Sequence, residues 1–570
     1  MKVRRPRQRI LLGRQSTQET TDRTDRAASF RSWDAAPSER AGRAVDGFGT
    51  SSDAHAASAD ATTGRDGRNQ DLSPDLKENT DYLKSVFDHA LDFVARSFRL
   101  ADGREAAVVF SKALCDETRI DVDVLAPLMR VNAPELPTPY DDQSIESIGS
   151  RLPVSNSQAI HTLQDAVDHV LLTKVILFVD GQSTALSFDL SDGASRAVEE
   201  PSTESVIRGP REGFTEKLET NISLLRRRLR TPAFKMEVME VGRYTKSKVM
   251  LCYLDEVASP QLLDEARRRL QRIDIDGIID SGYIEELIED TPYSPFPQLQ
   301  NTERPDVVAA NLLEGRIAIL TDGSPFALIA PINLWGALQA AEDYYERYLI
   351  ANAIRWLRYA FLVIALTLPA SYVAITTFHP EMLPTRLLLT VAAARDVTPF
   401  PAVVECLMME VTFEALREAG VRLPKTVGSA ISIVGALVIG QAAVEAGIVS
   451  APMVIVVSLT GIASFCIPRF NFAISIRMLR FPIILMAGFL GVFGIAISVL
   501  AVLIHLCSLR SFGQPYLQPV APYNRDGMKD AISRVPRWQM MRRPREGKQN
   551  ARRQSAAMKP SRRNPQGQEP

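Results

Sequence analysis

The chain is poor in the residues from which metal centres and disulfide frameworks are built. Its 570 residues include only five cysteines and six histidines. No two cysteines form a CxxC pair, and three of the five lie in apolar stretches. This pattern argues against a zinc site and a disulfide framework, and it suits a reducing compartment. We therefore expect neither a metal nor a cofactor.

Motifs of the common enzyme classes are missing as well. The chain has no GxxxxGK[ST] loop, no GxGxxG after a strand, no GxSxG elbow and no HExxH helix. His161 and His169 could share a helix face, but no carboxylate or cysteine pattern around them completes a metal site. We expect a protein that is not an enzyme and does not bind nucleic acid.

Charge is scarce in much of the C-terminal half. A helix needs about 20 apolar residues to cross about 30 Å of hydrocarbon. Four runs of about this length carry little or no charge: residues 356–378, 427–444, 448–467 and 481–507. Soluble cores rarely hold four such runs, so we expect an all-α membrane domain over residues 346–510, with four to six spans.

Residues before the first apolar run predict a water-soluble half. Hairpins alternate with helices; the strands 174–179 and 184–190, for example, flank an Asp180-Gly181 turn. We expect a mixed α/β (α+β) fold, with a first subdomain and linker at 76–150 and a second subdomain at 151–345. No secretory signal is visible before the first apolar run, so we expect this half to lie in the cytoplasm.

Both ends of the chain have the composition of disordered segments. Residues 1–75 contain few large apolar side chains and cannot bury enough surface to offset chain entropy. Residues 511–570 form a basic tail. The tail is either a solvated end or a segment attracted to anionic lipid headgroups.

Three carboxylates lie in a broken, charged region between the first two apolar runs. Glu410 and Glu414 share a helix face, whereas Glu405 points elsewhere. Ionisable groups at membrane depth commonly mark an ion path, and acidic pore linings favour cations. The alternative is a surface helix whose carboxylates lie in water. Gly435 and Gly440 would permit the close packing that a narrow pore requires, so all five residues are candidate pore or gate residues.

Several motifs, taken in order, resemble those of one protein family. They are TESVIRGPREGFTE at 203–216, ERPD at 303–306, EDYY at 342–345, RDVTPFP at 395–401, REAGVRLP at 417–424, IVGALVIGQAAVEAG at 433–447 and SFGQPY at 511–516. Together they closely resemble the A subunit of the GerA-family spore germinant receptors. The resemblance covers about residues 76–525.

The resemblance implies a multi-pass protein of the spore inner membrane. Members of the family work with a permease-like B subunit, which binds the nutrient, and with a lipoprotein C subunit. The A subunit is expected to form a homo-oligomer in contact with membrane lipid and to act as a nutrient-gated ion channel. A secondary transporter and a non-conducting scaffold or sensor are the alternatives.

Charged residues in three of these motifs are candidate coupling or inter-domain contacts. The RGPREG loop could hold an anion or serve as a turn between subdomains. The ERPD motif could form an inter-subunit or inter-domain ion pair, or a solvated corner. The EDYY motif, just before the first apolar run, suits either a joint that passes movement to the membrane or an interfacial anchor. The candidates are Arg208, Arg211, Glu303, Arg304, Asp306, Glu342 and Asp343.

The second apolar run can be tested with one charge. Replacing Gly435 with Arg should block insertion or assembly, because an arginine at the centre of a membrane helix costs about 3 kcal/mol. Immunoblots of washed membranes, together with germination assays, would measure this. Normal membrane levels and normal function would show that the run is not a span.

Overall fold

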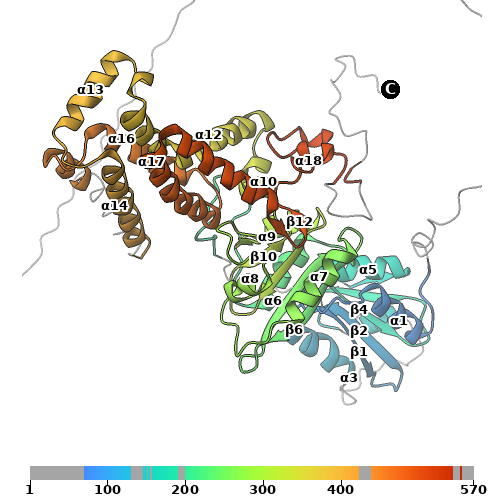
Figure 1. The fold of residues 1–570 in the computed structure, drawn as a ribbon. Helices are drawn as coiled ribbons and strands as arrows, with labels where there is room; N and C mark the ends of the chain where they lie inside the picture. Colours follow the sequence, from blue (N-terminus) through green and yellow to red (C-terminus); the bar gives the residue numbers. More distant parts are fainter. Residues whose placement is uncertain are drawn as a thin grey trace, which may run out of the picture. The chain divides into compact units, whose positions relative to one another are not determined.

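The computed structural model describes residues 70–129, 145–149, 152–154, 157–190, 199–422, 438–543 and 552–554. Nearly all of the predicted N-terminal extension at 1–75, and also Gly435, lie outside these ranges. Two α/β subdomains come first along the chain, and long apolar helices follow (Figure 1). The predicted order of a mixed α/β half followed by a helical half is confirmed.

The first subdomain is built on a five-stranded antiparallel sheet in the order β1-β2-β4-β5-β3. Successive residues of a strand face opposite sides. Val108 packs into a core with η1, whereas Val109 packs against α1 and α5 on the other face. The elements are α1 (Leu76–Val86), β1 (Phe93–Arg99), β2 (Glu105–Ser111), α2 (Glu117–Arg119), η1 (Ile120–Leu125), α3 (Ala126–Met129), α4 (Ile145–Gly149), β3 (Ser157–Ile160), α5 (Leu163–Leu171), β4 (Lys174–Val179) and β5 (Ala185–Asp189).

The boundary expected near residue 150 cuts through this sheet. The predicted hairpin does form as β4 and β5. However, β4 pairs with β2, with Leu177 opposite Val108, and so belongs to the first subdomain. Pairing between strands that are distant in sequence leaves no local signal. The boundary expected from the sequence therefore assigned the hairpin to the second subdomain. The first subdomain extends to the end of the β5 hairpin, about residue 190.

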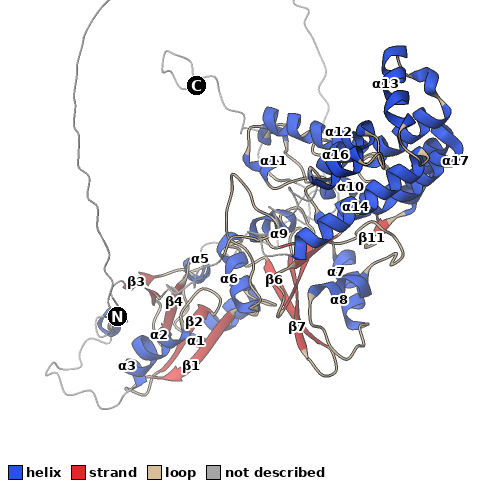
Figure 2. Cartoon of the chain, turned by 90° about the vertical axis from the view of Figure 1, so that its left-hand side faces the viewer, coloured by secondary structure: helices blue, strands red, loops and turns tan. Residues whose placement is uncertain are grey.

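The second subdomain repeats this plan with the strand order β6-β7-β9-β10-β8. On one face, Met250 packs with helices α6 and α9; on the other, Leu251 packs with α7 and α8 (Figure 2). The elements are α6 (Leu218–Arg228), β6 (Phe234–Val241), β7 (Ser247–Leu254), α7 (Pro260–Gln271), α8 (Ser281–Ile288), β8 (Gln300–Thr302), α9 (Pro305–Leu312), β9 (Ile317–Thr321) and β10 (Ala327–Ala330).

A buried ion pair ties the two subdomains together. The guanidinium of Arg226, from α6, donates to both carboxylate oxygens of Asp92 at 3.0 and 2.6 Å. The two side chains are only 1% and 5% exposed. The hydroxyl of Ser111 donates to the same carboxylate at 2.6 Å. A buried charge that keeps its partner is tolerated, but one that loses its partner is strongly destabilising.

Two helices of the C-terminal half are long and apolar enough to cross a membrane, α12 (Tyr348–Phe378) and α17 (Phe470–Ser508). They lie side by side (Figure 1), and the shorter apolar helix α16 (Ala451–Phe465) packs with α12. These three helices contain most of three predicted runs. Most of the fourth, 427–444, lies outside the described residues, although 438–445 is helical. The described part therefore holds two helices of crossing length, and the four to six spans stay a prediction.

The broken region between the first two runs forms separate helices. They are α13 (Thr385–Asp396) and α14 (Ala402–Arg422), divided by a segment that contains Pro399 and Pro401. A break also occurs inside α17, where Gly491 adopts φ 60° and ψ −141°. Only glycine reaches such a backbone conformation at low cost. The remaining short elements are α10 (Leu334–Ala337), α11 (Glu342–Tyr345), η2 (Pro380–Met382), β11 (Arg510–Ser511), β12 (Gln514–Pro515), α18 (Arg525–Met528) and η3 (Arg537–Gln539).

The C-terminal segment is not a solvated tail over its described residues. Tyr516 is fully buried and donates its hydroxyl to the carbonyl of Pro297 at 3.0 Å. Arg534, expected in a disordered end, is only 5% exposed. Arg553 forms an ion pair with Glu314 of the second subdomain. Composition suggested disorder because the residues that hold this segment lie some 180 to 240 positions away in sequence.

Removing one partner of the inter-subdomain pair should be costly. Replacing Asp92 with Ala leaves the Arg226 charge buried and should lower the free energy of unfolding by about 3–5 kcal/mol. Chemical denaturation followed by circular dichroism measures this. Asp81→Ala, which removes an exposed pair with Lys84, is the matched control and should cost under about 1 kcal/mol. Equal losses in the two variants would refute the role assigned to the pair.

Candidate functional site

The RGPREG loop is fastened to the second subdomain by a buried arginine. Arg304, which is 1% exposed, donates to the carbonyl oxygens of Glu204 at 3.1 Å and Pro210 at 2.8 Å. The same guanidinium pairs with Asp306 at 3.0 Å. Arg304 precedes Pro305, the first residue of α9, so the proline ring fixes the start of the helix that carries Asp306. The ERPD motif thus forms buried contacts within the chain and is not a solvated corner.

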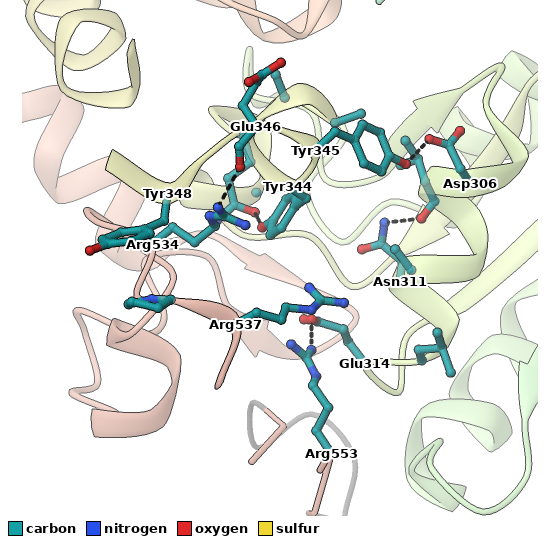
Figure 3. A pocket seen from close by; sticks show the side chains of 18 of the residues that line it. Asp306, Asn311, Glu314, Tyr344, Tyr345, Glu346, Tyr348, Arg534, Arg537 and Arg553 are labelled. Carbon is teal, nitrogen blue, oxygen red and sulfur yellow. Dashed lines mark hydrogen bonds and ion pairs between the residues drawn. The ribbon is translucent and has the colours of Figure 1, made fainter. Parts of the chain in front are cut away.

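The loop also contacts the segment that leads into the first apolar helix. The hydroxyl of Tyr345 donates to Asp306 (Figure 3). The amide of Ile207 donates to the Glu342 carboxylate at 2.6 Å. Gly209 has φ 142°, and a Cβ there would lie 2.8 Å from the Tyr345 ring. The loop and α11 therefore approach each other so closely that a side chain at Gly209 would clash with Tyr345. We call this contact, made by loop 203–216, Arg304, Asp306, Glu342 and Tyr345, the joint.

The joint is held by a neutral phenol. Burial, together with the hydrogen bond to Asp306, raises the pKa of the Tyr345 hydroxyl well above its usual range. The hydroxyl therefore keeps its proton at neutral pH and remains a donor. On the far side of the loop, Glu204 accepts from the Thr302 hydroxyl at 2.6 Å and pairs with Arg469, which precedes α17. Loop 203–216 thus contacts the segments that precede both α12 and α17.

A second cluster surrounds the first turns of α12. Asp343 is 3% exposed and accepts from both Nη atoms of Arg358, at 2.9 and 3.1 Å. The Nε of Arg355 lies 3.4 Å from the same carboxylate. The Nη1 atom of Arg355 pairs with Asp530 of the C-terminal segment at 3.1 Å. We call Asp343, Arg355, Arg358 and Asp530 the clamp.

Further hydrogen bonds tie the C-terminal segment to the clamp. Tyr344 donates its hydroxyl to Asp530 at 2.8 Å. Asn352 and the backbone of Arg534 exchange two hydrogen bonds, at 2.9 and 2.7 Å. Burial raises the pKa of Asp530, and the nearby Arg355 guanidinium opposes that rise. The start of α12 is therefore enclosed by two segments that lie far apart in the sequence.

The predicted coupling residues divide into buried and exposed groups. Glu303, Arg304, Asp306 and Asp343 are buried, and Glu342 contributes to the joint. Arg208 and Arg211 are about two-thirds exposed, and their carboxylate partners are 3.8 and 4.0 Å away, so they contribute little. The remaining members of the clamp were missed: Arg355, Arg358 and Asp530. Two arginines three apart at the start of an apolar run were the available signal.

The predicted pore carboxylates meet other groups of the same chain. Glu410 is 1% exposed and pairs with Arg480 of α17 at 2.5 Å. Glu414 lies 2.9 Å from Arg417 and 3.3 Å from Arg477. The pairs Glu410–Arg480 and Glu414–Arg477 join α14 to α17, and we call them the ladder. Glu410 is therefore buried, whereas the Glu414 side chain is 32% exposed, and both carboxylates are paired with arginines of the same chain.

The other candidate gate residues have packing roles where they are described. Glu405 is fully buried and accepts from the amide and hydroxyl of Ser450, the residue that precedes α16. A Cβ at Gly440 would lie 3.6 Å from Val454 of α16, an ordinary contact distance. Gly435 lies outside the described residues. Within the described ranges, no group of three or more His, Cys, Asp or Glu side chains is placed to hold a metal.

Comparison with known proteins shows extended similarity. The family described as "Bacillus/Clostridium GerA spore germination protein" matches residues 81–546. The chain is 50% identical to a Bacillus subtilis protein named "Uncharacterized membrane protein YfkQ", over 84% of this chain and 92% of that one. It is 46% identical to spore germination protein KA of Bacillus subtilis, over 83% of this chain and 87% of that one.

One solved structure is also similar. It is the N-terminal domain of the A subunit of the Bacillus megaterium spore germinant receptor GerK3. The match covers 46% of this chain and 97% of that domain, with 35% sequence identity and a TM-score of 0.37.

The ladder predicts a specific rescue. Glu410→Gln should leave the Arg480 charge buried, cost about 3 kcal/mol and lower the amount of protein in the membrane fraction. Adding Arg480→Gln should restore part of that amount. Quantitative immunoblots measure both, and Glu418→Gln, an exposed position on the same helix, is the control. Normal accumulation of the single variant, or no recovery in the double variant, would refute the structural role of the pair.

Proposed function

This chain belongs to the GerA family of spore germination proteins, and we propose that it is the membrane subunit of a nutrient germinant receptor. In this proposal it oligomerises into a nutrient-gated ion channel in the spore inner membrane, with the N-terminal half in the cytoplasm. The two helices of crossing length support the membrane placement. So does the name of one relative, a membrane protein that is 50% identical.

The partners follow from membership of the family. We propose that a permease-like B subunit binds the nutrient and that a lipoprotein C subunit completes the receptor. The structure favours this division of labour in one respect. The buried charges of the described chain, in the joint, the clamp and the ladder, are engaged in holding the protein's own segments together. Such groups are poorly suited to a nutrient site of this subunit's own.

The clamp is the observation that carries the proposed mechanism. Arg355 is fully buried between Asp343 and Asp530, so α12 cannot shift relative to these residues without uncovering a charge. The joint connects the same segment to the cytoplasmic half through Tyr345. A change in the assembled soluble domains would therefore move α12 as a rigid lever. Nutrient bound to the partner would act by shifting the population of two arrangements.

We propose that the ladder belongs to the closed arrangement. If α14 and α17 separate on activation, Glu410 loses Arg480, Glu414 loses Arg477, and the two carboxylates become available to cations. Glu405, Gly435 and Gly440 would then contribute to the helix packing that changes.

A secondary transporter is the second candidate, and one observation favours it. Of the two apolar helices that pack on each other, α17 is interrupted at Gly491, whereas α12 is continuous and contains Pro369. Interrupted helices form the substrate sites of many transporters. The purified oligomer in a lipid bilayer separates the candidates. Nutrient-gated current with the partner subunits present supports the channel, stoichiometric uptake supports a transporter, and neither supports a non-conducting scaffold or sensor.

The joint can be loosened without changing any charge. Gly209→Ala should displace the Tyr345 ring, because the new Cβ would lie 2.8 Å from it. We expect normal membrane levels and a several-fold slower nutrient response, measured as ion release from spores. Gly103→Ala is the matched control, since Gly103 also has a positive φ but nothing within 4 Å of a new Cβ. Equal responses in the two variants would remove the joint from the signalling route.

A further inference from the structure

A large cavity lies beside the joint and the clamp. Its volume is about 1060 Å³, which is enough for a drug-sized molecule. Its walls come from α9, from the lead into α12 and from the C-terminal segment. Figure 3 shows Tyr345 and Asp306 on one side, with Arg534, Arg537 and Arg553 reaching in from the C-terminal segment. The C-terminal segment therefore forms one wall of the cavity.

The lining carries an excess of positive charge. Seven arginines and three carboxylates face the cavity. Two of the carboxylates, Asp306 and Glu314, are already paired with Arg304 and Arg553. By contrast, none of the ion pairs in the described part of the chain uses the side chain of Arg347 or Arg537. Guanidinium groups present planar, forked donors that suit phosphate oxygens.

A buried arginine of the wall has unused donor capacity. Arg534 is 5% exposed, and one of its Nη atoms donates to the carbonyl of Glu346 at 3.1 Å. Its Nε is buried and has no hydrogen-bond partner among the described residues. Leaving a buried charged donor unsatisfied is costly, which suggests that a ligand completes it.

Part of the cavity lining has the composition of a membrane interface. It includes Tyr348, Leu349 and Ile350, the first residues of the candidate span α12, and the two apolar side chains are 68% and 51% exposed. The ring of Trp538 lies edge-on to Tyr348, with centroids 6.1 Å apart. Tyrosine and tryptophan gather at the level of lipid headgroups.

We propose that this cavity binds the phosphate of an anionic phospholipid headgroup, with its acyl chains leaving along the start of α12. Arg347, Arg534 and Arg537 would hold the phosphodiester, and the aromatic pair would rest against the glycerol. The proposal rests on the proposed membrane placement of α12. A bound lipid would complete the joint and clamp from the membrane side, and so make receptor assembly depend on lipid composition.

Lipid retention by the purified full-length protein tests the site. The protein in neutral detergent is mixed with phosphatidylglycerol or with phosphatidylcholine, and retained lipid is counted by native mass spectrometry. We expect preferential retention of phosphatidylglycerol. The double variant Arg347→Gln/Arg537→Gln should weaken it roughly 25-fold, at about fivefold per removed charge. Arg525→Gln, an exposed arginine of α18 outside the cavity, should change nothing.

Three results would overturn the assignment. They are equal retention of the two lipids, an unaffected double variant, and competition by inorganic phosphate as effective as competition by the lipid. The last would indicate a site for a free anion. Alkaline extraction of cell membranes tests the membrane placement separately. If the protein stays in the pellet but shows no lipid preference, the cavity assignment fails and the proposed function stands.

Discussion

A guanidinium that cannot reach water imposes the main constraint on this structure. Arg355 lies in the first turns of an apolar helix and is fully buried. The effective cost of taking one such charge out of water is several kcal/mol. Asp343 and Asp530 supply the compensation, yet they come from segments 12 positions before and 175 positions after it. The helix, the lead into it and the C-terminal segment must therefore assemble together or not at all.

That constraint explains how a soluble half can act on apolar helices. Asp343 belongs to the same short helix, α11, as Tyr345, which reaches Asp306 in the second subdomain. Arg226 and Asp92 hold the first subdomain to the second in the same manner. Buried pairs thus recur at each junction along the chain. Because each resists separation, movement at one end is transmitted instead of being absorbed.

Sequence periodicity and turn residues predicted those elements whose formation depends on neighbouring residues. The hairpin of β4 and β5 was predicted at nearly its observed bounds, since periodicity and turn residues specify it. Pairing across long separations was not predictable. Nothing near Asp530 marks it as the partner of Arg355, and the basic composition around it suggested a solvated tail. Glu410 and Glu414 were correctly placed on a helix, but their partners Arg480 and Arg477 lie on another helix.

The most direct measurement is hydrogen–deuterium exchange on the full-length protein in detergent. The clamp predicts that residues 526–535 and 342–358 are protected, and that Asp343→Asn lets both segments exchange faster together. Exchange of 526–535 at the rate of an unstructured chain in the unaltered protein would contradict it. So would faster exchange of 342–358 alone in the variant, because the clamp requires the two segments to open as one unit.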